Sequence, residues 1–372
     1  MRRIKLLIVI SILSVSMYGC SKKSDFTDSA NQNILSYIVE NYDYYNNGVV
    51  YGKTTAAFLD FDTMETSILC PVPNCTHQSL DCLAKKAGNT PVFYKDNIYY
   101  FISNNGEVKE TTKGKIFFFD SNLMKTSINS LNTEEVCAFH DCAPPSDFST
   151  YVLYNNELYF IGDDMGVEED SYGGFSWGNT GGTHFLCSIN LDNGEYTNHG
   201  SVYDGDKEFE AAAYSSQSTI LGVYKGKMYI GYTYVEDMNA LNTGLFEFTY
   251  KNFEFDFKSK TLSESNLPYS NYMNSNTYTY YDKANKQIHI IHNESERTIP
   301  YDYDVRDCSE FNGKFFMHHE GKWFDLIDNS EHSLGEYKDY KVVGYEDDCY
   351  IFLNGGRSKK VSEKELLSLD KG

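Results

Sequence analysis

The chain has 372 residues and carries 53 acidic against 32 basic side chains, a formal net charge of −21. Such an acidic surface repels nucleic acid and anionic lipid headgroups, which excludes both as partners bound through charge. Aromatic residues make up 16% of the chain, with 32 Tyr and 24 Phe. This composition is typical of many short, half-exposed strands, in which a tyrosine ring packs while its hydroxyl stays in water.

The first twenty residues have the pattern of a secretion signal. Three basic residues among the first five precede the apolar run Leu6–Val15, and Gly19 precedes Cys20. The run is too short for a membrane span, which needs about 20 apolar residues. The Gly19–Cys20 junction resembles the lipobox of bacterial lipoproteins, whose new N-terminal cysteine carries a lipid. An ordinary secretion signal with a chance cysteine is the alternative.

The lipobox resemblance implies a signal peptide over 1–19 and a mature chain that is acylated, for example with palmitate, at Cys20. The mature chain would lie on the outer face of the cytoplasmic membrane, at the cell surface. It keeps 29 basic and 53 acidic side chains, so the lipid and not charge would hold it there. Residues 20–42 are expected to form a lipidated tether, and 43–372 the folded domain. Within the tether, 33–42 fits one or two helical turns or the domain entry.

One pattern recurs along the domain: an aromatic half-strand, a two-residue polar turn and a second aromatic strand. It occupies the segments 91–103, 151–163, 220–232, 278–292, 309–319 and 342–354. Turn pairs such as Asn155-Asn156 and Asn312-Gly313 tolerate the left-handed backbone that tight hairpins need. Further strands follow several hairpins, which predicts an all-β fold, a β-propeller of about six four-stranded blades, or seven if 200–270 hides another. Unrelated hairpins in a sandwich or open sheet are the alternative.

The two ends of the domain carry their own signals. Strands at 48–69 lack a preceding hairpin, and the last repeat lacks clear outer strands. We therefore predict that the chain start and the chain end complete one blade together. At the C-terminus, Ser362 is followed three residues later by Glu365, a capping box that predicts a short helix over 362–369.

Two clusters of cysteine and histidine follow similar points of the repeat. The first contains Cys70, Cys75, His77 and Cys82, and the second contains Cys137, His140 and Cys142. Three thiolates and an imidazole suit tetrahedral Zn²⁺, although the spacing matches no standard zinc motif. Outside the membrane, cysteines more often form disulfides, which limit the freedom of the unfolded chain. Disulfides are the leading interpretation, while zinc and free or redox-active thiols stay open; no other cofactor is indicated.

The segment around the first cluster carries a second resemblance. Leu69–His77, with Cys82, follows an opening strand pair and precedes the hairpin at 91–103. In this arrangement the chain resembles uncharacterised propeller-like lipoproteins of anaerobic Gram-positive bacteria. The resemblance implies architecture and an envelope location, and it implies no activity.

One catalytic pattern occurs, the G-x-S-x-G of Gly174–Gly178. A nucleophile elbow needs a strand before the serine and a helix after it, whereas these flanks are glycine-rich loop. No catalytic residue is therefore assigned, and Phe175 and Trp177 are instead candidate ligand contacts on a loop over 163–183. Acidic runs at 163–170, 204–208 and 302–307 lack EF-hand order and indicate solvated loops.

These features favour a lipid-anchored binding or scaffold protein that contacts a protein or carbohydrate outside the cell. Variable loops, especially 163–183 and 235–244, would supply the contacts. The alternative is an extracellular enzyme acting on polysaccharide or peptide, with carboxylates at the propeller centre. A propeller supports either role, so fold alone does not decide between them.

Overall fold

The computed structural model describes the chain from residue 34 to residue 369 with gaps. The described residues are 34–38, 42–44, 48–51, 55–70, 72, 74–79, 81–87, 91–111, 114–127, 130, 132–140, 151–163, 166–169, 175–176, 183–204, 217–234, 249–270, 272–274, 276–301 and 308–369. The chain divides into two compact units, 1–32 and 33–372, and every described residue belongs to the second. Most regular elements in this part are β-strands.

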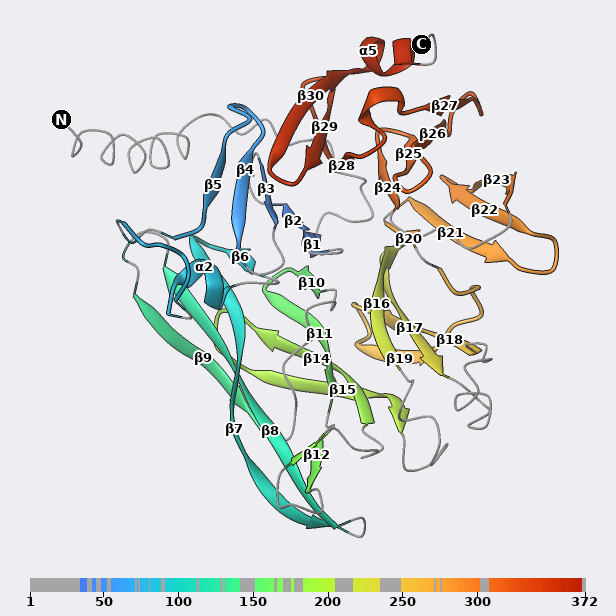
Figure 1. The fold of residues 1–372 in the computed structure, drawn as a ribbon. Coiled ribbons are helices and arrows are strands. Elements are labelled where there is room, and N and C mark those ends of the chain that lie inside the picture. Colours follow the sequence, from blue (N-terminus) through green and yellow to red (C-terminus); the bar gives the residue numbers. More distant parts are fainter. Residues whose placement is uncertain are drawn as a thin grey trace. The chain divides into compact units, whose positions relative to one another are not determined.

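Seven antiparallel sheets follow one another along the chain (Figure 1). Sheet 1 contains β2 (Tyr42–Tyr44), β3 (Gly48–Tyr51), β4 (Ala57–Asp60) and β5 (Thr66–Ile68). Sheet 2 contains β6 (Val92–Tyr94), β7 (Asn97–Thr111), β8 (Gly114–Ser127) and β9 (Thr133–Phe139). Sheet 3 contains β10 (Tyr151–Tyr154), β11 (Glu157–Asp163), β14 (Thr183–Asn190) and β15 (Tyr196–Asp204). Sheet 4 contains β16 (Gln217–Tyr224), β17 (Lys227–Tyr234), β18 (Thr249–Asp256) and β19 (Thr261–Glu264).

The remaining sheets are built in the same way. Sheet 5 contains β20 (Tyr272–Met273), β21 (Thr277–Asp282), β22 (Gln287–His292) and β23 (Ser295–Pro300). Sheet 6 contains β24 (Cys308–Phe311), β25 (Lys314–Met317), β26 (Lys322–Asp325) and β27 (Glu331–Ser333). Sheet 7 contains β28 (Lys341–Glu346), β29 (Cys349–Asn354) and β30 (Arg357–Ser362). Three short helical elements accompany them in the described part of the chain: α2 (Leu83–Lys86), η2 (Gly335–Tyr337) and α5 (Glu363–Ser368).

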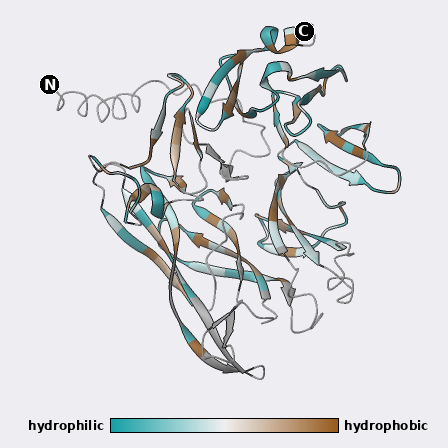
Figure 2. Ribbon diagram, in the orientation of Figure 1, coloured by the Kyte–Doolittle hydropathy of each residue, from teal (hydrophilic) through white to brown (hydrophobic). Residues whose placement is uncertain are grey.

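The hydrophobic core lies between the sheets. Six clusters of buried side chains join each sheet to the next, from sheet 1 to sheet 7. A seventh closes the series, because Val49 and Leu59 of sheet 1 pack with Ile351 and Leu353 of sheet 7. Figure 2 shows the source of these clusters: hydrophobic residues, in brown, are interspersed with hydrophilic residues along the strands. Sheets that each pack on two neighbours, the last on the first, are the blades of a seven-bladed β-propeller.

Turn chemistry explains why the repeated hairpins form. Lys95 and Asp96 have φ of 45° and 59°, and Asn312 and Gly313 have φ of 52° and 71°. Two successive positive φ values are the geometry of a type I′ turn, whose twist matches the flanking strands. All six predicted hairpins are present; the one at 278–292 is the middle pair of blade 5, not its first pair.

A second turn motif closes the third strand of four blades. An Asp or Asn at the strand end accepts a hydrogen bond from a turn amide two or three residues later, which fixes the reversal. These residues are Asp60, Asn190, Asp256 and Asp325, with bonds of 2.8–3.0 Å. The motif marks the outer turn of a blade, and the sequence analysis did not use it.

The prediction that the chain start and end share one blade is wrong. β2 pairs with β3, so blade 1 has four strands of its own, and blade 7 has three strands in the described part of the chain. The larger predicted count, seven, is correct because these two halves are separate blades. Within 200–270, the described residues form the end of β15 and blade 4, and no additional blade. At the seam, Gly344 of β28 leaves room for blade 1, since a Cβ there would lie 2.7 Å from the Phe61 ring.

The chain enters the propeller through a strand and not through helical turns. β1 (Ile34–Ile38) pairs antiparallel with β10, with Ile34 opposite Tyr154 and Ile38 opposite Tyr151. It therefore adds a fifth strand to blade 3, beside that blade's first strand. Residues 34–42, assigned to the tether by the sequence analysis, thus include a strand of the propeller.

The C-terminal helix forms as predicted. Ser362 is the N-cap of α5, and its hydroxyl accepts a 3.2 Å hydrogen bond from the Glu365 amide. Glu365 turns its carboxylate to the Tyr337 hydroxyl, 2.9 Å away, and Leu366 is buried between blades 6 and 7. None of the helices among the described residues has the length and apolar character of a membrane span.

Candidate metal centre

The first cysteine cluster (Cys70, Cys75, His77 and Cys82) lies in the connection between blades 1 and 2. Strand β5 ends at Ile68, and tight turns follow it along the chain. The amide of Cys70 donates to the Ile68 carbonyl at 2.7 Å, and the amide of Cys75 donates to the Val72 carbonyl at 3.2 Å. These turns reverse the chain within a few residues, so side chains that are distant along an extended strand converge.

Two residues of this connection have left-handed backbone. Asn74 has φ of 61° and His77 has φ of 57°. Asn and His tolerate this region better than most residues, which explains why these types stand here. A non-glycine residue held in this conformation is a constraint that surrounding contacts must maintain.

The turns bring the four side chains of the cluster together. One ligand atom of each, a sulfur or a ring nitrogen, lies within 4.8 Å of all the others. The Cys82 sulfur is 3.5 Å from His77 Nδ1, and the His77 backbone amide donates to the Cys75 sulfur at 3.4 Å. An amide that donates to sulfur favours the thiolate.

The thiols of the first cysteine cluster hold their protons unequally. Burial raises the pKa of Cys70 to about 11. Burial acts to raise the pKa of Cys82 as well, but hydrogen bonds with His77 and with the Lys85 amide lower it to about 7. At neutral pH the metal-free cluster therefore contains an ionisable thiol beside a protonated one, a donor set for a thiophilic metal or for oxidation.

Helix α2 fixes this cluster to the propeller core. It follows Cys82 directly, and Ala87 after it is buried in the cluster between blades 1 and 2. The Ala56 amide donates to the Ala84 carbonyl at 2.9 Å, and the Leu69 amide donates to the Ala56 carbonyl at 3.0 Å. These hydrogen bonds, at Leu69 and Ala84, therefore hold both ends of the cysteine segment to blade 1.

The second predicted cluster is only partly described. The Cys137 thiol, in β9, donates to the Ala138 carbonyl at 3.6 Å. The His140 Nδ1 atom lies 3.1 Å from the Asp120 carboxylate, so this imidazole is paired with a carboxylate. Cys142 lies outside the described residues.

None of the seven described cysteines is joined in a disulfide. Cys187 is fully buried between blades 2 and 3, where its sulfur is 3.0 Å from the Tyr196 hydroxyl. Cys308 and Cys349 lie in β24 and β29. The disulfide interpretation from the sequence stays a prediction.

The predicted contact loop at 163–183 contains two strands. β12 (Gly166–Glu169) pairs with β8 and extends the long hairpin of blade 2, and β13 (Phe175–Ser176) pairs with β12 at the sheet edge (Figure 1). The next described element is the strand β14, not the helix that a nucleophile elbow requires. Trp177 and the loop at 235–244 lie outside the described residues.

Oppositely charged side chains pair across the junctions between blades. The pairs are Lys95–Asp192 at 2.7 Å, Lys225–Glu294 at 3.0 Å, Lys314–Glu363 at 2.8 Å, and Lys260–Glu157. Three of them join one blade to the next, and Lys314 of blade 6 pairs with Glu363 at the start of α5, directly after blade 7. Sequence reasoning missed these pairs because the partners lie tens of residues apart. The available signal is a lysine in or beside a tight turn and an acid beside a turn or helix start of the neighbouring element.

The seam between blades 7 and 1 has acids on both sides instead. Carboxylate oxygens of Asp62, Glu346 and Asp347 lie within 4.8 Å of one another. Lys360 approaches Glu346 and Asp347 at 3.8 and 3.9 Å. Burial raises the pKa of Glu346, and the negative charges of Asp62 and Asp347 add to this rise against the opposing Lys360. The seam is therefore electrostatically strained compared with the paired junctions.

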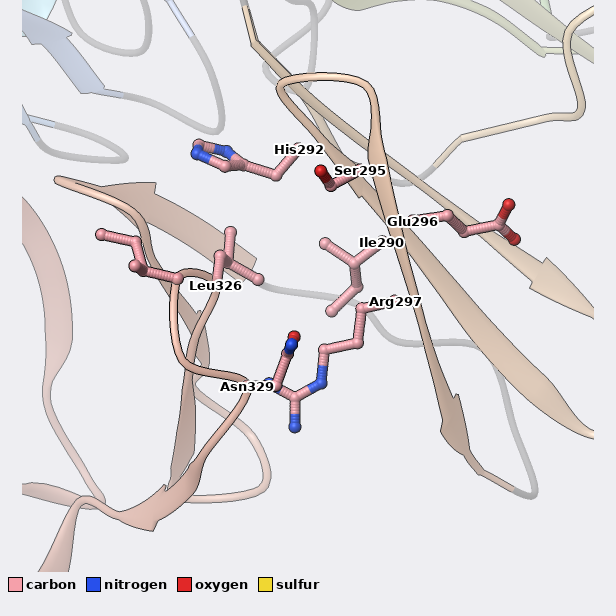
Figure 3. A pocket seen from close by; sticks show the side chains of 8 residues that line it. Ile290, His292, Ser295, Glu296, Arg297, Leu326 and Asn329 are labelled. Carbon is pink, nitrogen blue, oxygen red and sulfur yellow. The ribbon is translucent and has the colours of Figure 1, made fainter.

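A small pocket lies between blades 5 and 6 (Figure 3). Its volume is about 140 Å³. Its walls are Ile290, His292, Ser295, Glu296, Arg297, Leu326, Ile327 and Asn329. The Arg297 guanidinium is 4.7 Å from the centre of the Phe324 ring and donates to the Asp325 carbonyl at 3.3 Å. Drug-sized ligand sites occupy about 300–1,000 Å³, so this pocket fits only a single small group.

Comparison with known proteins identifies structures of similar fold. No family model and no curated protein matches the chain. Acylaminoacyl peptidase of Pyrococcus horikoshii has a TM-score of 0.43 and 11% identity, with 91% of this chain and 54% of that chain covered. The propeller domain of the Trilobed protease of Pyrococcus furiosus, which has an open velcro topology, has a TM-score of 0.42 and 9% identity, with 90% and 92% covered.

Dipeptidyl peptidase 4 of Porphyromonas gingivalis has a TM-score of 0.40 and 8% identity, with 91% of this chain and 54% of that chain covered. The chain thus spans about half the length of the two peptidases. At these identities the likeness concerns the fold alone.

Proposed function

We propose that the protein is a lipid-anchored binding or scaffold protein that works outside the cytoplasmic membrane. The anchor is supported by the Gly19–Cys20 junction after a basic and apolar start, which resembles a lipobox. The working part is the propeller, in which core clusters join every blade to two others. Such a frame holds its turns and loops in fixed positions, and this favours recognition.

The position of β1 carries the proposal. This strand begins at Ile34, 14 residues after Cys20, and is hydrogen-bonded into blade 3. Fourteen residues span at most about 50 Å when fully extended. A lipid on Cys20 would therefore hold the propeller within about 50 Å of the membrane, as suits a module that presents a surface there.

We propose a protein or a carbohydrate as the ligand. The pocket between blades 5 and 6 offers Arg297 and Asn329, and the Ile327 side chain beside them is 78% exposed. Arginine beside accessible apolar surface is a common composition for a contact point in protein recognition. The acidic net charge argues against nucleic acid as the ligand.

The enzyme alternative needs two carboxylates about 5–9 Å apart on either side of a substrate bond. In the described part of the chain, acids converge at Asp62, Glu346 and Asp347, on turns at the seam and beside Lys360. That place fits a strained junction between blades better than a substrate cleft. We therefore keep binding as the proposal and the enzyme as its alternative.

The anchor is tested by expressing Cys20→Ser in a bacterium beside the wild type. The wild type is expected in the membrane fraction, with a mass that begins at Cys20 and includes acyl chains, and protease added to whole cells should cut it. Cys20→Ser should lose the acyl mass, and the control Cys349→Ser should keep it. A wild type cut after residue 19 without acyl chains would contradict the anchor.

The binding role is tested separately, with glycan arrays and with cross-linking on intact cells. A specific glycan or cross-linked protein that is retained by the wild type and lost by Arg297→Ala supports the proposal. A glycan or peptide that the wild type converts into products would support the enzyme instead.

A further inference from the structure

We propose that the first cysteine cluster binds one Zn²⁺ ion as a closed structural site, which clasps the connection between blades 1 and 2. The inference is independent of the lipid anchor and of the ligand. It rests on the spacing of the donor atoms, on the number of thiols and on the position of the cluster in the fold.

The donor atoms are close enough together to form a tetrahedral site. With Zn–S of about 2.3 Å and Zn–N of about 2.0–2.1 Å, a tetrahedron places sulfur and nitrogen about 3.5 Å apart and two sulfurs about 3.8 Å apart. The Cys82 sulfur is 3.5 Å from His77 Nδ1, and no pair of donor atoms exceeds 4.8 Å. Shifts of about 1 Å therefore complete the site.

The number of donors favours a metal over a disulfide. A disulfide would join two of the three thiols and leave the third thiol and the imidazole of His77 without a role. Zn²⁺ uses all four, and the His77 amide that donates to the Cys75 sulfur supplies the outer hydrogen bond that commonly supports a bound thiolate. Four protein donors leave no open coordination position, so the site is structural and not catalytic.

The position of the cluster defines what the ion would do. Cys70 follows β5, the outer strand of blade 1, and Cys82 precedes α2, which is hydrogen-bonded to Ala56 in the same blade. One ion would join both ends of the segment 70–82 and hold the left-handed backbone at Asn74 and His77. Blade 1 borders the seam, which no shared strand closes among the described residues, so the clasp would stabilise a blade at that seam.

Metal content of the purified full chain is the first readout. Elemental mass spectrometry of the purified protein should find about one zinc per chain. When Co²⁺ replaces the zinc, the protein should show thiolate-to-metal charge-transfer absorption. Cys75→Ser and His77→Ala should lose the ion, and the control Cys349→Ser should keep it. A chelator should lower the melting temperature of the wild type and of Cys349→Ser, and leave that of Cys75→Ser unchanged.

Three outcomes would overturn the proposal. They are a wild type that neither contains nor takes up zinc, a disulfide among Cys70, Cys75 and Cys82 in non-reducing peptide maps, or a different metal at full occupancy. If Cys75→Ser does not fold, the Co²⁺ spectrum of the wild type decides alone, because thiolate absorption needs no variant.

Discussion

The hydroxyl of Ser358 donates a 3.1 Å hydrogen bond to the backbone carbonyl of Met64, which lies 294 positions earlier in the chain. Ser358 belongs to blade 7 and Met64 to the turn after β4 in blade 1. The bond crosses the seam where the two ends of the propeller meet. Among the described residues, side chains and not a shared strand hold this seam, so its stability depends on the few apolar residues packed there.

Ile351→Ala tests that dependence. Ile351 is fully buried in the seam cluster, and truncating a buried isoleucine to alanine costs about 2–5 kcal/mol of unfolding free energy. Urea unfolding of both proteins measures the difference. Ile327→Ala is the matched control, because Ile327 is 78% exposed and such a change should stay within about 0.5 kcal/mol. Equal losses in the two variants would contradict a packed seam.

Glu346→Gln should stabilise the protein at neutral pH. Burial and the neighbouring acids raise the pKa of Glu346 above that of the unfolded chain. In the range between these two pKa values the folded state binds more protons, so the stability contributed by Glu346 falls as pH rises. Glutamine removes this penalty, and the melting temperature should rise at pH 7 but not at pH 4.

Glu331→Gln is the control for this substitution. Glu331 forms an ordinary ion pair with Lys322 at 2.7 Å, so its removal should not raise the melting temperature. A Glu346→Gln variant that is less stable than the wild type at pH 7 would show that the Lys360 attraction outweighs the repulsion.

His184 should make the fold sensitive to acid. Burial lowers the pKa of His184 to about 4, and its Nδ1 is 2.6 Å from the Ser218 hydroxyl. Between pH 6.5 and 4 the unfolded chain protonates this histidine and the folded chain does not. Stability is therefore lost as pH falls through this range, by up to about 1.4 kcal/mol per pH unit.

His184→Asn should flatten this dependence when unfolding free energies are measured at pH 7, 6 and 5. Ile327→Ala should keep the slope of the wild type, because it removes an exposed apolar side chain and no titrating group. Parallel slopes for His184→Asn and the wild type would rule out His184 as the source.

Ser362→Ala should weaken the end of the last blade. The Ser362 hydroxyl caps α5, and its loss costs about 0.5–2 kcal/mol, whereas glycine at an N-cap costs only a few tenths. Thermal unfolding of Ser362→Ala and Ser362→Gly should therefore rank alanine as the less stable. The opposite order would mean that the hydroxyl is not the cap.

Local signals were enough to predict the repeated hairpins and the four-stranded blades, but not that the first and last blades are separate. A tight hairpin is encoded within a dozen residues, as at Lys95-Asp96, and the capping box of α5 is encoded within four. The Asp60 turn also marks a complete outer hairpin in blade 1. This signal was available in the sequence and would have indicated that blade 1 needs no strands from the chain end.

Contacts between distant segments could not be predicted in the same way. β1 pairs with β10 across more than a hundred residues, and Asp62 meets Glu346 only because blade 1 packs on blade 7. No local spacing encodes either contact. The first cysteine cluster lies between these cases: proximity followed from its short spacing, while the arrangement of the four donors needed the turns at Asn74 and His77.

The hydrogen bonds between β1 and β10 also decide where mechanical load enters the molecule. Tension on the N-terminal segment would reach Ile34 first and pass into blade 3 through the β10 ladder. Blade 3 is separated from the seam by two other blades, so a pull from that end would spare the joint closed by side chains. The hydrogen bonds between β1 and β10 would therefore break before the seam between blades 7 and 1 bears any force.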